Sequence, residues 1–189
     1  ELFYKEKQAS FVIQTMESID EYLQGAPDEP HRHNYYTVIW PFTGAGRHII
    51  DFKEYAILPD HIFFVSPGQV HQMLVEGHPT GVVIQFTCNF LGKYGIQEEF
   101  ISNLRLFRNS DETPPLPLSD NMIPRLKLFS DNMFLAFGNP DNMQLDTIGA
   151  WLKLFLIECN TQCSLYPDLN PQSAEVGRTM VRRFKEVVE

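Results

Sequence analysis

The sequence lacks the features that would direct it into a membrane, an oxidising compartment or a complex with nucleic acid. No apolar run approaches the roughly 20 residues that cross a bilayer, and the first residues have neither the basic start nor the apolar stretch of a signal peptide. The cysteines, Cys88, Cys159 and Cys163, form no Cys-x-x-Cys pair, which favours reduced thiols. A net charge of −9 opposes contact with a phosphate backbone. We therefore expect a cytoplasmic protein that contacts no membrane and binds no DNA by itself.

The first half of the chain has the pattern of short β-strands separated by turns. Runs rich in Val, Ile, Phe and Tyr recur at intervals of about ten residues, with Gly, Pro and Asp between them. The predicted strands are 11–16, 35–40, 47–52, 55–58, 61–65, 72–75 and 82–86. Such even spacing indicates a sandwich or barrel rather than βαβ units. No helical period is visible before residue 90.

After Phe90 the apolar residues recur at three- and four-residue steps, which is the period of amphipathic helices. The stripes cover 96–107 and 123–137, and a third helix follows Asp141. Its segment 150–157 is apolar nearly all round and needs cover on more than one side, either from the barrel and the second helix or from a second subunit. We favour a homodimer. The predicted dimerisation residues are Trp151, Leu152, Leu154 and Phe155.

These patterns predict a mainly β fold with C-terminal helices, divided into four parts. Residues 1–15 form an N-terminal arm whose apolar side chains lie over the mouth of a barrel, and residues 16–92 form that β-barrel. Residues 93–170 form a helical dimerisation segment, and residues 171–189 form a last helix that carries Arg182, Arg183 and Lys185. The apolar stripe of this helix is unfinished at Glu189, so we expect the sequence to be cut from a longer protein.

Polar side chains suited to a binding pocket gather at two places in the predicted barrel. Alternate residues of a strand face the same way, so positions 31, 33, 35 and 37 share one face, and a Pro-Gly turn brings position 71 beside them. Three imidazoles can hold a divalent metal or form hydrogen bonds with a ligand. The candidate ligand-binding residues are His31, His33, Tyr35, Thr37, His71, Met73 and Gln85.

Other polar and aromatic residues are expected to lie outside this pocket. Tyr36 and Trp40 fall on the opposite strand face and should pack beneath the helices. His48 and Asp51 point to opposite faces of one strand, so both cannot enter the pocket. Histidines 61 and 78 stand at turn edges and should be exposed.

Two segments in order resemble a known family. His-x-His followed by Gly-x-x-His resembles the two cupin motifs, and residues 43–48 and 59–71 look like the AraC-type regulatory domain. The resemblance implies a cupin-like jelly-roll β-barrel followed by a helical dimerisation segment, and a role in sensing a small-molecule effector rather than catalysis. It also implies that residues 171–189 are a linker helix. DNA would be bound only through a helix-turn-helix domain that this chain lacks.

The sequence departs from related patterns at two threonines. Metal-binding cupins have Glu where this chain has Thr37, and the arabinose regulator has a sugar-binding Arg where Thr43 stands, so we assign no metal and no cofactor and expect a different ligand. Two alternatives stay open. One is a metal-dependent cupin enzyme, an oxygenase or isomerase with His31, His33 and His71 as ligands. The other is a dimerisation module whose barrel is filled by large side chains such as Phe63.

Overall fold

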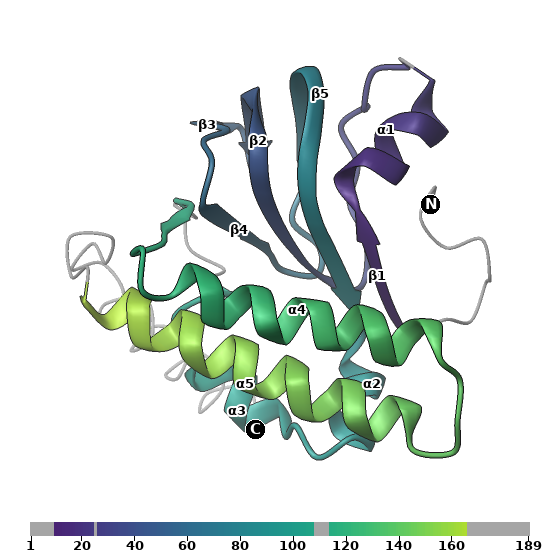
Figure 1. Ribbon diagram of the computed structural model, residues 1–189. Coiled ribbons are helices and arrows are strands. Elements are labelled where there is room, and N and C mark those ends of the chain that lie inside the picture. Colours follow the sequence, from purple (N-terminus) through teal and green to yellow (C-terminus); the bar gives the residue numbers. More distant parts are fainter. Residues whose placement is uncertain (1–9, 25, 108–113, 166–189) are drawn as a thin grey trace.

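The computed structural model of the protein describes residues 10–24, 26–107 and 114–165. Antiparallel strands dominate the first half and helices the second (Figure 1), which confirms the predicted fold class. The elements in chain order are β1 (Phe11–Thr15), α1 (Met16–Leu23), β2 (Tyr36–Ile50), β3 (Lys53–Ala56), β4 (His61–Val65), β5 (His71–Phe86), α2 (Cys88–Lys93), α3 (Glu98–Asn103), β6 (Leu116–Pro117), α4 (Ile123–Gly138) and α5 (Gln144–Leu165).

Two long strands, β2 and β5, form the centre of the sheet. The strand order is β1-β5-β2-β4-β6, and β3 pairs with β2. Each long strand joins two predicted strands, so the predicted breaks after Trp40 and after Val75 are wrong. The chain passes these points through bulges instead, with register shifts between Pro41 and Ala45. Gly46 is needed there, because its φ is 133° and a Cβ atom would collide with the carbonyl oxygen of Leu74.

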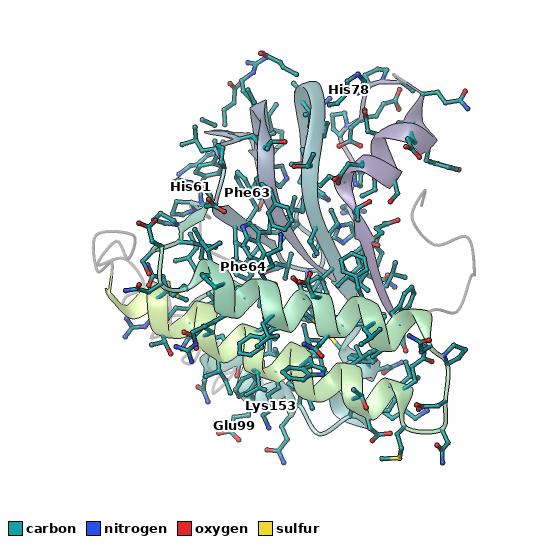
Figure 2. All side chains as sticks on the ribbon, in the orientation of Figure 1. His61, Phe63, Phe64, His78, Glu99 and Lys153 are labelled. Atoms are coloured by element: carbon teal, nitrogen blue, oxygen red, sulfur yellow. The ribbon has the colours of Figure 1, made fainter. Side chains whose placement is uncertain are left out.

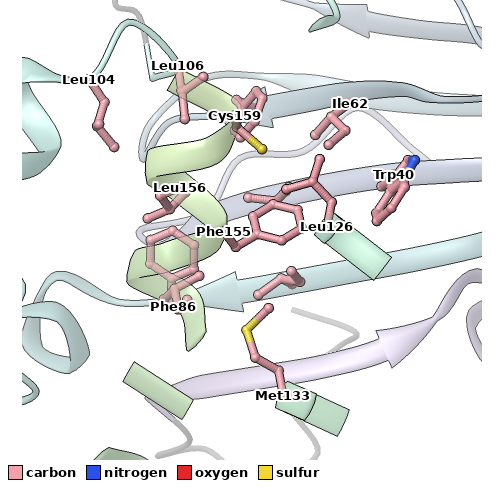
Figure 3. Close-up of a cluster of buried hydrophobic side chains, with 14 of the residues drawn as sticks. Trp40, Ile62, Phe86, Leu104, Leu106, Leu126, Met133, Phe155, Leu156 and Cys159 are labelled. Carbon is pink, nitrogen blue, oxygen red and sulfur yellow. The ribbon is translucent and has the colours of Figure 1, made fainter. Parts of the chain in front are cut away.

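One face of the sheet packs against α4 and α5 and forms the larger core (Figure 3). Val38 and Trp40 from β2 point into it, as the two-residue period of a strand requires. The Trp40 ring lies 6.3 Å from the ring of Phe155 on α5. The predicted packing of Trp40 beneath the helices is therefore confirmed. We call this set the helix-side core; it also includes Ile62, Phe64, Ile84, Phe86, Leu126, Met133, Leu152 and Leu156.

The two long helices run side by side across the base of the sheet (Figure 1). The helix predicted over 123–137 agrees closely with α4, and the apolar segment 150–157 lies within α5. Leu152 and Phe155 have no exposed surface, so neither can contact a second subunit in this structure. The sheet and α4 supply the cover that this apolar segment requires. Only Trp151, which is half-buried, and Leu154, which is exposed, remain available for the predicted dimer.

Two N-terminal elements differ from the predicted arm and barrel. Residues 11–15 of the predicted arm form β1, which pairs with β5 along its whole length. The chain then forms α1, and α2 begins at Cys88, so the expectation of no helix before residue 90 is wrong. The Thr15 hydroxyl oxygen accepts from the Ser18 amide at 3.2 Å and caps α1. A helix of eight residues is too short to show a repeating period in sequence.

Several predictions fall on residues that the structure does not describe. Residues 1–9 of the arm and the whole linker helix, 171–189, lie outside the described ranges. Within residues 10–24, 26–107 and 114–165, none of the helices has the length and apolar content that spanning a bilayer requires.

Candidate functional site

A cavity of about 900 Å³ lies between α1 and the face of β2 and β5 turned away from the long helices. Ligand pockets range from about 300 to 1,000 Å³, so this one has room for a small organic molecule. The alternative of a filled barrel is therefore wrong. The surface of the cavity is mainly apolar. It includes side chains of Met16, Ile19 and Leu23 of α1, Ile39 of β2, and Met73, Val75 and Val83 of β5.

The structure brings nearly all of the predicted pocket residues to this cavity. Those that line it are His31, His33, Thr37, His71, Met73 and Gln85. Tyr35 is buried and does not line it, but its ring stacks on that of His33 with centroids 3.9 Å apart. Tyr35 therefore supports a wall residue. The ligand-binding roles of all seven residues stay predictions.

Histidines from three parts of the chain form one hydrogen-bonded cluster at the cavity wall. The Nε2 atoms of His33 and His71 are 2.9 Å apart, and His48 Nε2 lies 3.1 Å from His71 Nδ1. The Thr37 hydroxyl lies 3.2 Å from His33 Nε2. Backbone bonds fix His31 to the start of β5, because His31 and His71 exchange amide-to-carbonyl bonds of 3.0 and 2.8 Å. The arrangement is a chain of imidazoles in the order His33, His71, His48.

The backbone determines which nitrogen of each ring carries the proton. His33 Nδ1 lies 2.8 Å from the Tyr35 carbonyl oxygen, which can only accept, so this nitrogen donates and Nε2 is left as the acceptor. His71 must then donate from Nε2 and accept at Nδ1, and His48 must donate from Nε2. His48 Nδ1 is left as an acceptor that is buried and has no partner among the described residues. All three rings are neutral in this pattern.

Burial accounts for the neutral state of these rings. Loss of solvent lowers the pKa of His33 to about 4, of His48 to about 3 and of His71 to about 2, and the neighbouring His31 lowers each further. The cluster therefore offers neutral donors and acceptors at pH 7 rather than positive charge. Beside it, burial raises the pKa of Asp28, whose carboxylate accepts from the Met73 amide at 2.8 Å.

His48 is the member of the cluster that sequence reasoning missed. It is fully buried, packs against the Phe63 ring at a centroid distance of 4.8 Å, and stands behind His71 rather than in the cavity wall. Its place depends on the pairing of β2 with β5, in which His48 lies opposite Met73 and Ile50 opposite His71. The only local signal is that position 48 alternates with the apolar Ile50.

The remaining polar candidates have separate positions. The Asp51 carboxylate accepts from the Gln69 side chain at 2.8 Å and from the Val70 amide at 3.0 Å, away from the cavity. His78 is 95% exposed, as predicted, and lies in the middle of β5, where the strand is farthest from the long helices (Figure 2), with Nδ1 2.8 Å from Asp20 of α1. His61 is only half-exposed, which differs from the prediction.

Two features of the cavity wall are chemically unfinished. The Gln85 Oε1 atom is buried and has no hydrogen-bonding partner among the described residues, so this lining residue holds an unsatisfied acceptor. His31, His33 and His71 each present a nitrogen, and these nitrogens all lie within 4.8 Å of one another. The first feature suits a ligand with a hydrogen-bond donor, and the second can hold a metal ion.

Comparison with known proteins gives one family match. The model of the family described as "AraC-like ligand binding domain" matches residues 19–126, which contain the histidine cluster and every lining residue of the cavity except Met16 and Glu17. None of the curated proteins compared with this chain matches it.

Solved structures give weaker likenesses. Apo ToxT K231A from Vibrio cholerae has 12% identity and a TM-score of 0.46, over 88% of this chain and 59% of that one. The AraC-like transcriptional activator CuxR has 12% identity and a TM-score of 0.48, over 82% and 52%. The ribosomal oxygenase YcfD from Escherichia coli has 15% identity and a TM-score of 0.30, over 75% and 47%. The chain spans 59% and 52% of the first two structures.

Proposed function

The chain belongs to the family of AraC-like ligand binding domains, and from this membership we propose that it is the effector-binding, dimerising half of a bacterial transcription regulator. The observation that carries the proposal is the cavity of about 900 Å³, nearly all of whose lining residues belong to the matched region. Its walls combine apolar side chains with a few polar groups at fixed positions, which is the usual composition of a small-molecule site. DNA binding would reside in a helix-turn-helix domain outside this chain.

The chemistry of the wall defines the class of effector. Most of the surface that lines the cavity is apolar, and the histidines of the cluster are neutral. The lining also includes the carboxylates of Glu17, Asp20 and Asp28, so the cavity suits a largely apolar molecule without strong negative charge. Gln85 supplies an unused acceptor and Thr37 a hydroxyl. We therefore propose an effector with an apolar body and at least one hydrogen-bond donor placed against Gln85.

Helix α1 is positioned to transmit occupancy of the cavity. It forms one wall, and two contacts attach it to β5: Glu17 accepts from the Gly81 amide at 3.2 Å, and Asp20 contacts His78. Helix α1 continues directly from β1, whose Phe11 ring lies 6.0 Å from Phe137 on α4. A ligand that binds more tightly when α1 is in one of two positions would favour that position, and β1 and α4 would shift with it.

The proposal also includes a subunit arrangement and a compartment. The dimer surface would lie on the outer side of α5 at Trp151 and Leu154, because the inner side is used for the core. Cys159 and Cys163 are both buried on one face of α5 and form no disulfide, which supports a reducing cytoplasm. No catalytic function is proposed.

A thermal-shift screen of small apolar donors tests effector binding directly. A ligand at 100 times its Kd stabilises the folded state by about 2.7 kcal/mol and raises the melting temperature of the wild type. Val83→Phe fills the cavity and should abolish the shift, whereas the surface variant Leu135→Ser on α4 should retain it. Hits that shift Val83→Phe as much as the wild type would show that they bind elsewhere, and a screen without hits would count against the proposal.

A further inference from the structure

Three histidines converge at the cavity wall with the geometry of a metal site. We propose that His31, His33 and His71 bind a divalent transition-metal ion through their Nε2 atoms, with His48 as a positioning residue behind His71. The candidate ligand nitrogens lie within 4.8 Å of one another. The Nε2 atoms of His33 and His71 are only 2.9 Å apart, a separation at which two bare lone pairs repel, so either a proton or a cation must lie between them.

The other nitrogen of each ring is already held by an acceptor. His31 Nδ1 lies 2.7 Å from the Glu29 carbonyl oxygen, and His33 Nδ1 lies 2.8 Å from that of Tyr35. His71 Nδ1 lies 3.1 Å from His48 Nε2. Histidines that bind metals almost always donate their second ring N–H to such a partner, which fixes the tautomer and the ring orientation. His33 and His71 therefore direct Nε2 toward each other, and Nε2 is the nitrogen that the Glu29 carbonyl leaves free on His31.

Metal binding requires His48 to change tautomer. In the metal-free chain His71 donates from Nε2 and accepts at Nδ1 from His48 Nε2. When Nε2 of His71 binds the ion, its proton moves to Nδ1 and is donated to His48 Nε2, and the proton of His48 moves to its own Nδ1. No proton is gained or lost by the pair. The moved proton lies on a buried atom without a partner, which costs part of the binding free energy.

The donor set selects the class of metal. Three imidazoles without a carboxylate suit zinc, copper, nickel or iron rather than magnesium or calcium. The carboxylate nearest to these rings, that of Asp28, lies 3.4 Å from the Nδ1 side of His31 and so belongs to the surroundings of a ligand. All three histidines line the cavity, so a further coordination position would face it and be open to an effector atom.

Zinc titration of the chelator-treated chain, followed by calorimetry, tests the site without any effector. We expect one equivalent of Zn²⁺ to bind to the wild type. His31→Ala should abolish stoichiometric binding while leaving the fold intact, since this ring is partly exposed. His61→Ala removes a histidine that does not line the cavity and should bind as the wild type does. Less than about a tenth of an equivalent, or equal binding by His31→Ala, would overturn the proposal. Either result would leave the thermal-shift test of effector binding unaffected.

The role of His48 has its own readout. Loss of a partner of this kind typically weakens metal binding 10- to 100-fold, which we expect for His48→Leu. His48→Gln should recover most of the affinity, because the Gln side-chain terminus can occupy the place of Nε2 and accept from His71. Long-range ¹H–¹⁵N spectra of the wild type should show the His48 proton on Nε2 without zinc and on Nδ1 with it. An unchanged tautomer, or no difference between the Leu and Gln variants, would contradict the positioning role.

Discussion

The two faces of the β2–β5 pair differ in how they are filled, although they belong to the same strands. The helix-side core is filled with large apolar side chains such as Trp40, Phe86 and Phe155 (Figure 3). The opposite face keeps a cavity of about 900 Å³ and a row of neutral histidines. Residues one position apart, such as Val38 and Ile39, face the two sides. A single sheet thus gives one face to stability and leaves the other for binding.

The contrast also appears at β4, where consecutive phenylalanines divide between the faces (Figure 2). Phe64 belongs to the helix-side core, and Phe63 contacts His48 on the cavity side. Both are buried, but only Phe63 touches a polar group of the histidine cluster. The histidine cluster on the cavity side is therefore supported by apolar packing beneath it.

Removal of a large side chain should cost more on the helix side than on the cavity side. Phe155→Ala leaves a new void under the sheet and should lower the free energy of unfolding by about 3–5 kcal/mol. Ile39→Ala enlarges a space that already exists and should cost about 2 kcal/mol, the low end for such changes. Urea unfolding of the two variants measures both values. Equal costs would show that the cavity wall is packed as tightly as the core.

Acid should weaken the cavity side selectively. Because burial lowers the pKa of His48 and His71 below the unfolded value of 6.5, their contribution is complete above pH 6.5 and is lost as the pH falls toward their folded pKa values. Each should remove about 2 kcal/mol of stability between pH 7 and pH 5. Urea unfolding of the chelator-treated protein at several pH values measures the slope.

A variant without one imidazole provides the control for the acid experiment. His48→Phe should reduce the slope of stability against pH by the share of one histidine, because one proton fewer is taken up on unfolding. The groups that face these rings, His31, His33 and Asp28, remain in place. A slope identical to that of the wild type would mean that His48 is accessible to protons in the folded state.

The division of the sheet into two faces could be predicted from local sequence. Alternation along 35–40 sends Trp40 to the helices and Thr37 to the pocket, and the structure has them there. The helical period likewise located α4 and α5. These features depend on residues that are close along the chain.

Features that depend on pairing between distant segments could not be predicted. The residues around Gly44 and Gly46 give the same signal for a turn and for a bulge, and only the register with β5 decides between them. His48 reaches His71 through that same register. Leu152 and Phe155 are covered within the chain by a sheet face that comes from far along the sequence, which the pattern of α5 alone does not indicate.

Replacement of the polar wall residue Gln85 should affect the stability of the fold and the affinity for an effector in opposite directions. Gln85→Leu removes a buried oxygen without a partner and should leave the free energy of unfolding unchanged or raise it by about 1 kcal/mol. The same change should weaken binding of any donor-bearing effector about tenfold, since the acceptor is removed. Urea unfolding and ligand titration together check both effects. A large loss of stability would show that Gln85 is structural.

The smallest effect on the folded unit is expected on the outer side of α5. Leu154 is 46% exposed, so Leu154→Ser should change the unfolding free energy of the monomer by less than about 0.5 kcal/mol. If the proposed dimer uses this side, the same change should raise the dissociation constant measured by sedimentation equilibrium. Thr161→Ser, another exposed change on the same helix, is the matched control and should leave association unchanged. Association that is equal in all three proteins would place the dimer surface away from Leu154, because truncation of an apolar side chain at the centre of an interface weakens binding.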